Sequence, residues 1–250
     1  MRYASILLLL LGLTAAAYLF TKPESPTHAP TQTAFARAHS GTKDVFVRQL
    51  CLLSAEDLAM LPTIDGFEYP CGTAQGAFFY DAQAMGTPNA KRGGMHLGSD
   101  LNGIGGGASD EGEPVYAMGR GLVVYSGCPA EAWGNVVVLA HRCPDGRIIQ
   151  SLYAHLKELR VKRGTLLARG QQLGTIGGAD GQYVPHLHLE LIESLRIEAG
   201  LPAYLDHHSP AHLSLQEVMQ QYPAPVVRDC YQSIRRQAAR STIELRPVSS

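Results

Sequence analysis

The sequence predicts a mainly β protein, a β-rich fold with short flanking helices and antiparallel sheets. Glycine and proline are abundant, with 26 and 15 residues among 250, and they separate short apolar segments as turns separate strands. The apolar residues of these segments often alternate, and most connections between them are too short for crossover helices. Neighbouring strands are therefore expected to pair antiparallel.

The strand pattern occupies the middle of the chain, and short helices flank it on both sides. The expected strands cover 76–83, 114–127, 135–142, 148–156, 171–178 and 186–193. Two helical stretches are expected within 43–61, where Ser54 and Asp57 can cap the second, and two more at 214–222 and 231–240.

The first residues predict export. Residues 4–20 carry no charge and follow Arg2; the run is short for a membrane span and long for a signal-peptide core. The small residues 15–17 suit cleavage, whereas the apolar residues 18–20 continue as an uncleaved anchor would. We expect 1–21 to be a signal peptide or an N-terminal membrane anchor. Either way the protein is exported to the periplasm or cell envelope, secreted or tethered to the inner membrane by residues 4–20.

The rest of the chain divides into four predicted segments. These are a flexible linker at 22–42, an N-terminal extension at 43–92 that packs on the core, the core at 93–200, and a C-terminal helical extension and tail at 201–250. The linker is rich in Pro, Thr, Ser and Ala, a composition typical of extended tethers. The core contains most of the strand pattern and the motifs described below.

Charge and cysteine content restrict the partners and the compartment. A net charge of −1 gives no basis for binding polyanions, so we expect no nucleic acid partner. The five cysteines suit an oxidising compartment, but an odd number leaves at least one unpaired within the chain. We favour a Cys51–Cys71 disulfide, with Cys230 free or paired with one of the others. Cys128 and Cys143 should lie at opposite ends of one strand, too far apart to bond.

Two histidines in the last expected strand indicate a site. Side chains two apart in a strand project from the same face, so His186 and His188 point together while the leucines beside them face the core. Alone, such a pair is better explained by two surface histidines on a half-exposed strand. His96 and Asp100 change this interpretation, because zinc is commonly held by His nitrogens and carboxylate oxygens, with one position kept for water.

Three motifs contain these residues in a recognisable order: HLGSD at 96–100, YAHL at 153–156 and PHLHLE at 185–190. With the strands between them, the stretch 93–193 resembles the lysostaphin/LytM family of zinc metallopeptidases, which are peptidoglycan endopeptidases. The resemblance implies a lysostaphin-like peptidase core whose antiparallel sheets form an open groove. The glycine-rich loops 102–113 and 176–184 adjoin the motifs and would wall that groove.

The resemblance also assigns roles. It implies one Zn2+ per chain, with His96, Asp100 and His188 as its ligands. His155 and His186 would be catalytic residues beside the metal-bound water, one as general base and the other orienting the water or stabilising the oxyanion. Zinc lowers the pKa of its water to about 7, so a neutral imidazole can accept the proton near neutrality. Which of the two histidines does so is left open.

Other polar residues near the motifs have competing interpretations. Glu190 shares the strand face of the two histidines and either orients an imidazole or forms an ordinary salt bridge. Three further histidines lack a carboxylate partner at ligand spacing, and we interpret them as loop and helix-entry residues: His207, His208 and His212.

The predicted function is a zinc-dependent endopeptidase that hydrolyses the peptide cross-links of bacterial peptidoglycan, with the peptide stems as substrate. The alternative is a non-enzymatic LytM-like module that binds the cell wall or activates another wall hydrolase. A third hypothesis is a secreted protease that acts on a glycine-rich host protein or a rival's wall. The presence of all five site residues favours the enzyme. Because an accessible groove would be hazardous in the envelope, we also expect an envelope regulatory protein as a partner.

Overall fold

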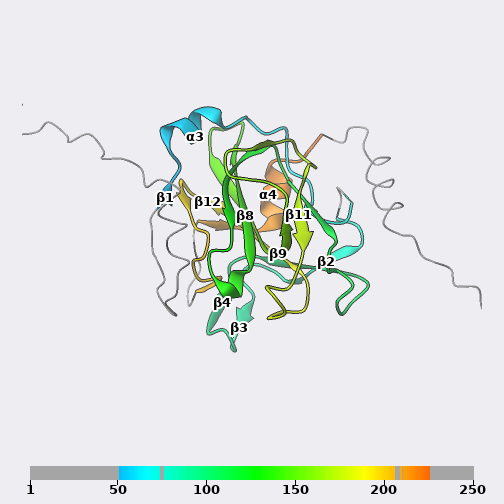
Figure 1. Cartoon of the computed structure of the whole chain (residues 1–250). Coiled ribbons are helices and arrows are strands. Elements are labelled where there is room, and N and C mark those ends of the chain that lie inside the picture. The colour runs from blue at the N-terminus through cyan, green and yellow to red at the C-terminus, as the bar shows by residue number, and fades with distance from the viewer. Residues whose placement is uncertain (1–50, 74–75, 206–208, 210, 226–250) are drawn as a thin grey trace, which may run out of the picture. The chain divides into compact units, whose positions relative to one another are not determined.

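The computed structural model describes residues 51–73, 76–205, 209 and 211–225. Within these ranges the protein is mostly antiparallel β-sheet with few helices, which confirms the predicted fold class (Figure 1). The export segment, the linker, the first part of 43–61 and the expected helix at 231–240 lie outside them. No helix in the described ranges is long and apolar enough to cross a membrane.

The main sheet has ten strands, and its central path runs β10-β7-β8-β9-β12-β5-β2. The strands on this path are β2 (Phe79–Gln83), β5 (Ser99–Gly103), β7 (Gly121–Gly127), β8 (Asn135–Arg142), β9 (Ile148–Leu159), β10 (Leu166–Leu167) and β12 (Leu187–Glu193). Beside the path, β11 (Gln172–Ile176) pairs with β6 (Pro114–Tyr116) and β9, and β15 (His212–Leu213) pairs with β12. All of these pairings are antiparallel, as predicted.

The remaining described strands form two small sheets. One joins β1 (Cys51–Leu52) to β13 (Arg196–Ile197), and the other has the order β14 (Tyr204–Leu205), β4 (Gly94–His96), β3 (Pro88–Asn89). The sequence analysis expected none of these strands. They are two or three residues long, which is too short for apolar alternation to be visible.

The central strands of the main sheet are buried on both faces. Within β8, Val137 and Leu139 belong to one core, whereas Val136 and Val138 belong to the other. The sequences of such strands are continuous runs of apolar residues, because neither face of the strand is exposed to solvent. Full burial of each aliphatic side chain contributes roughly 1.5–3 kcal/mol to the stability of the folded state. The two cores therefore stabilise the sheet that carries the site.

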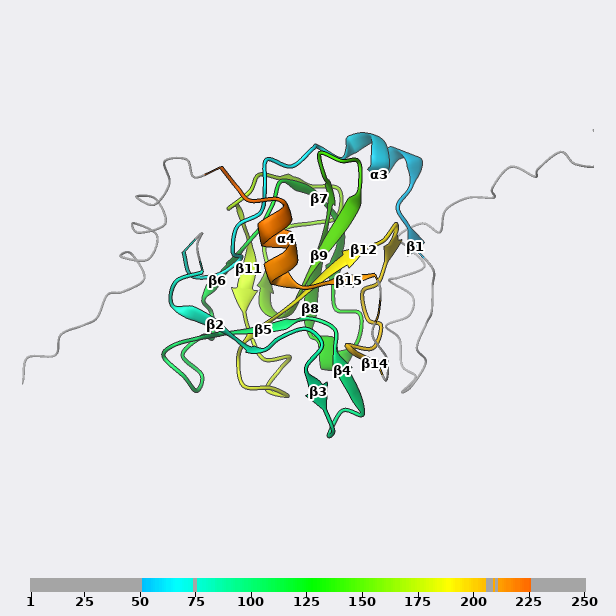
Figure 2. The ribbon, with the colours of Figure 1, turned by 180° about the vertical axis from the view of Figure 1, so that it is seen from behind.

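Short helices cover the two cores. The helix α4 (Leu215–Gln221) packs Leu215 and Val218 onto one face, where Figure 2 shows it lying across the strands. The helix α3 (Ala55–Met60) lies between Leu53 and Leu61, which enter the other core. Its N-terminus has the predicted capping box: the Asp57 amide donates to the Ser54 hydroxyl at 3.0 Å, and the Ser54 amide donates to the Asp57 carboxylate at 3.1 Å.

The expected strand 114–127 is divided into β6 and β7. At the break the Met118 amide donates to the Tyr153 hydroxyl at 3.0 Å instead of to a neighbouring strand. Gly121, at the start of β7, has no room for a side chain, since a Cβ there would lie 2.7 Å from His141 Nδ1. The chain therefore turns at 117–120 over a buried tyrosine and histidine that are distant in sequence.

The pairing of β7 with β8 confirms the prediction about Cys128 and Cys143. Gly127 lies opposite Val136 at one end of the hairpin, so Cys128 lies beyond that end, while Cys143 follows the far end of β8. The side chain of Cys51 is outside the described part of the structure, as is Cys230. The Cys51–Cys71 disulfide therefore stays a prediction.

The position of β12 between β5 and β9 brings the three motifs together. His188 lies opposite Asp100 on β5 and opposite Ala154 on β9. His96 ends β4, and the turn from β4 into β5 passes close to β12 at Gly98, where a Cβ would lie 2.5 Å from the Leu189 carbonyl oxygen. Only glycine allows that approach, which sets His96 beside His188.

Candidate metal centre

Three side chains from three strands converge on one point. The distance from His96 Nε2 to His188 Nδ1 is 3.1 Å, from His96 Nε2 to Asp100 Oδ1 3.3 Å, and from His188 Nδ1 to Asp100 Oδ1 2.8 Å. Ligand atoms of tetrahedral zinc, at about 2.0–2.1 Å from the ion, would lie about 3.3 Å apart. These residues form the one group in the described part of the chain with the composition and spacing to hold a metal ion.

The outer nitrogens of the two histidines fix which nitrogen faces the centre. His96 Nδ1 lies 2.9 Å from the Gln83 carbonyl oxygen, and His188 Nε2 lies 3.0 Å from Glu190 Oε1. Because carbonyl and carboxylate oxygens only accept hydrogen bonds, these outer nitrogens carry the protons. In the neutral imidazoles the inner nitrogens are then acceptors facing an acceptor carboxylate. A cation bound between these three acceptor atoms would satisfy all of them. Two imidazole nitrogens and one carboxylate oxygen are a set of ligands that fits zinc.

The charges around the centre agree with a cation site. Burial acts to raise the pKa of Asp100, but hydrogen bonds from His186, His188 and His96 lower this pKa far below its usual range. Burial acts to lower the pKa of His188, yet the hydrogen bonds and charges of Asp100 and Glu190 raise it to about 9. Asp100 is thus held ionised, and positive charge is stabilised at the point where the three ligand atoms meet.

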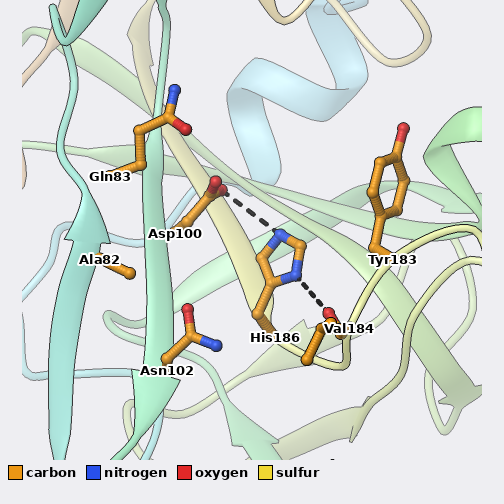
Figure 3. A pocket seen from close by; sticks show the side chains of 7 residues that line it. All are labelled: Ala82, Gln83, Asp100, Asn102, Tyr183, Val184 and His186. Carbon is orange, nitrogen blue, oxygen red and sulfur yellow. Dashed lines mark hydrogen bonds and ion pairs between the residues drawn. The ribbon is translucent and has the colours of Figure 1, made fainter. Parts of the chain in front are cut away.

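The two histidines predicted to be catalytic lie beside this centre. His186 Nδ1 donates to the Val184 carbonyl at 2.8 Å, and its Nε2 lies 3.5 Å from Asp100 Oδ1 (Figure 3). His155 Nδ1 donates to the Trp133 carbonyl at 3.2 Å, and its ring centroid is 4.9 Å from that of His186 and 5.7 Å from that of His188. The structure thus brings together all five residues that the sequence singled out.

The position of His155 depends on a backbone irregularity. Its φ is 60°, a left-handed conformation in the middle of β9, where the register with β8 also shifts. A bulge of this kind takes a side chain out of the alternation of its strand. His155 is buried, and that burial, with the neighbouring charges of His188 and His186, lowers the pKa of its imidazole to about 3. His155 is therefore a neutral imidazole in this environment.

Behind His188 lies a second layer that the sequence analysis interpreted incompletely. Glu190 is buried, and its two oxygens lie 3.0 Å from His188 Nε2 and 3.5 Å from His212 Nε2. Glu190 therefore orients the His188 imidazole, which was one of its two interpretations. The interpretation of His212 as a residue without a carboxylate partner is wrong, because the pairing of β15 with β12 carries it next to Glu190. His207 and His208 lie outside the described residues.

A pocket opens in front of the centre, and Figure 3 draws its walls. It is lined by Ala82, Gln83, Asp100, Asn102, Tyr183, Val184 and His186. Tyr183 and Val184 come from the loop between β11 and β12, and Asn102 lies near the end of β5. Ala82 and Gln83 belong to β2, so the segment before the first ligand also contributes to the pocket. From the sequence, the segment 43–92 was expected only to pack on the core or to cover the groove.

Sequence comparison places the chain among known proteins. It belongs to peptidase family M23, whose family model matches residues 94–198. Lipoprotein NlpD of Yersinia enterocolitica is 30% identical over 84 residues, which cover 34% of this chain and 81% of that protein. The peptidoglycan DD-endopeptidase ShyA of Vibrio cholerae is 38% identical over 105 residues, 42% of this chain and 22% of that protein.

Further similar proteins include a cell division protein and lysostaphin. The cell division protein DipM of Caulobacter vibrioides is 36% identical over 81 residues, 32% of this chain and 13% of that protein. The chain thus spans less than a quarter of the length of several curated relatives. The structure of lysostaphin from Staphylococcus simulans aligns with a TM-score of 0.48 at 20% identity, over 67% of this chain and 59% of that one.

Proposed function

We propose that this protein is a zinc-dependent endopeptidase that hydrolyses peptide cross-links of bacterial peptidoglycan. The observation that carries the proposal is the convergence of His96, Asp100 and His188 with two further histidines beside an open pocket. Membership of family M23 and the similarity to ShyA, named a peptidoglycan DD-endopeptidase, support it. The segment 93–200 would be the metallopeptidase core, and residues 4–20 would deliver or tether it in the envelope.

His96, Asp100 and His188 would hold the zinc ion. Bound zinc would polarise the scissile carbonyl and supply a water of lowered pKa as nucleophile. Glu190 accepts the hydrogen bond of His188 Nε2, so Nδ1 is the nitrogen that would bind the ion. Asp100 brings one negative charge, so the ligand set would leave the site with a net positive charge that favours an electron-rich carbonyl oxygen.

His155 and His186 would carry the proton chemistry. Each donates through Nδ1 to a backbone carbonyl, which leaves Nε2 as the nitrogen able to accept a proton or a hydrogen bond. The Nε2 of His186 faces Asp100, so it adjoins the centre directly. One of the two would take the proton of the attacking water and return it to the leaving amine, while the other would hold the water or the oxyanion.

A non-enzymatic wall-binding or activating module is the second candidate. Some relatives are named without an enzymatic activity, among them the cell division protein DipM and the lipoprotein NlpD. The complete set of five site residues supports the enzyme over this alternative, because a binding module has no need of ligands and bases in this arrangement. An envelope regulatory protein is a further proposal within either function.

Digestion of purified sacculi by the full-length protein tests the proposal. We expect new amine and carboxyl ends without new reducing sugar, loss of this release with a zinc chelator, and its recovery when zinc is added back. Asp100→Ala is the matched inactive control. Reducing ends would indicate a glycosidase instead. Release that occurs only when a second wall hydrolase is present, and equally with Asp100→Ala, would support the activating module.

A further inference from the structure

Arg92 stands at the edge of the metal centre, clamped between two aromatic rings. It lies in the exposed turn between β3 and β4, four residues before His96. Its guanidinium carbon is 5.4 Å from the centroid of the Tyr183 ring and 6.0 Å from that of the Tyr204 ring. Cation–π contacts with two rings restrict a side chain that would otherwise be mobile at an exposed turn.

The two rings that hold Arg92 also contact the centre itself. The Tyr183 ring packs on His155, with centroids 4.6 Å apart, and Tyr183 lines the pocket together with Asp100 and His186 (Figure 3). The Tyr204 ring packs on His96 at 5.1 Å. The guanidinium carbon is therefore at most about 11 Å from the centroid of the His96 ring, so Arg92 lies close to the residues that would hold the scissile bond.

Arg92, like Arg120 and Arg142, has no carboxylate partner within the described residues, whereas five other arginines do. Arg147, Arg160, Arg163, Arg169 and Arg196 all pair with carboxylates. Arg92 forms no ion pair with any residue in the described ranges; the hydrogen bond it makes there is from its backbone amide to Asn89 Oδ1, at 3.2 Å. Within the described ranges its guanidinium donors are thus available to a group outside them, such as a bound ligand.

We propose that Arg92 binds a free carboxylate of the substrate next to the bond that is cleaved. A guanidinium is a planar fork that matches a carboxylate in two parallel hydrogen bonds, and the two tyrosines hold it in place before substrate arrives. This inference rests on the proposed endopeptidase function and narrows its substrate class. Cross-links through diaminopimelate keep a carboxylate on the carbon that bears the amide nitrogen, whereas glycine bridges have none there.

Two cross-linked peptide dimers that differ in one group test this assignment. Both are joined through diaminopimelate, and in one the carboxyl beside the cross-link amide is free while in the other it is amidated. We expect zinc-loaded wild-type protein to cleave the free acid with a kcat/KM at least about tenfold higher. Arg92→Gln should lower that kcat/KM by roughly 10- to 100-fold and abolish the preference, while leaving cleavage of the amidated dimer nearly unchanged.

Lys91→Gln is the matched control, because it removes the same charge from the same exposed turn without touching either tyrosine contact. It should retain the wild-type preference. Equal kcat/KM for the two dimers in the wild type, or an equal loss on both in Arg92→Gln, would overturn the role of Arg92 while leaving the endopeptidase intact. If wild-type protein cleaves neither dimer, the proposed function fails separately. In that case, calorimetry measures the affinities of the wild-type protein for the two dimers. Tighter binding of the dimer with the free carboxyl would support the role of Arg92, and equal affinities would refute it.

Discussion

Two hydrogen-bond networks are built around buried histidines, and they differ in whether the protein alone satisfies their polar groups. In the first, His141 Nδ1 donates to the Arg120 carbonyl at 2.8 Å, and Ser151 Oγ lies 2.7 Å from His141 Nε2 and 3.0 Å from the Tyr153 hydroxyl. Each donor there has an acceptor. In the second network, His188 Nε2 contacts the Glu190 carboxylate. His188 Nδ1 faces His96 Nε2 and Asp100 Oδ1, so three groups able to accept hydrogen bonds lie together.

Burial alone therefore does not separate a structural histidine from a candidate metal ligand. His141 and His188 are both almost without solvent exposure. Burial lowers the pKa of His141 to about 4, whereas for His188 the same effect is outweighed by Asp100 and Glu190, which raise its pKa to about 9. The closed network leaves no acceptor free for a cation, whereas the open one can be satisfied by a second proton on His188 or by a bound cation. Substitutions in three places test this contrast.

The largest effect is expected from the proposed metal ligands. His188→Ala or Asp100→Ala should remove the bound zinc and lower activity on sacculi by about 10³-fold or more. His186→Ala and His155→Asn should keep the zinc but lose comparable activity; asparagine is chosen because it tolerates the positive φ of His155. Elemental analysis beside the digestion assay distinguishes the two groups. Full zinc occupancy in His188→Ala, or an active Asp100→Ala protein, would defeat the assignment.

The closed network should control acid stability. The folded pKa of His141 is lowered from 6.5 to about 4, so only the unfolded chain binds this proton between those values. Stability is therefore complete above pH 6.5 and falls as the pH drops toward 4, by about 3 kcal/mol in full and about 2 kcal/mol between pH 7.5 and 5.0.

Urea denaturation of wild type and His141→Gln at those two pH values measures this contribution. The variant should be less stable at pH 7.5, because it loses part of the hydrogen-bond network, but its further loss at pH 5.0 should be smaller than that of the wild type by about 2 kcal/mol. An equal loss in both proteins would assign the acid sensitivity to other groups. Zinc occupancy at pH 7.5 should not change, since His141 does not contact the ligands.

The smallest effect concerns the second layer of the open network. His212→Leu removes the group 3.5 Å from Glu190 Oε2, so Glu190 should hold His188 less firmly and zinc affinity should fall about tenfold. His212→Gln can donate to the same oxygen and should recover part of that loss. Competition with a metal chelator gives the affinities. If His212→Leu binds zinc as tightly as the wild type, His212 serves only to fill space beneath β12.

The sequence predicted those parts of the fold and of the site that follow from local patterns and motifs. The strand 135–142 was predicted with the bounds it has in the structure, because its apolar run is bounded by turn residues on both sides. The grouping of His96, Asp100 and His188 followed from motifs that resemble a known family. The roles of these residues stay proposals until they are tested.

The remaining features depend on contacts that no local pattern contains. The φ of His155 reflects a bulge, and alternation along β9 gives no sign of it. His212 reaches Glu190 through a pairing of two short segments, β15 and β12, and Arg92 is held by rings 91 and 112 positions further along the chain. Sequence reasoning finds such residues only when the tertiary neighbours are already known.

The distribution of the ligands over β4, β5 and β12 has a mechanical consequence. His96 and His188 are 92 residues apart in the chain, and β4 belongs to a different sheet from the other two strands. An ion bound by all three residues would act as a cross-link that closes this long segment, and long closures remove the most freedom from an unfolded chain. The ion would therefore fasten the small sheet to the large one, so its loss should loosen the β3–β4 turn and the arginine it carries before it unfolds the core.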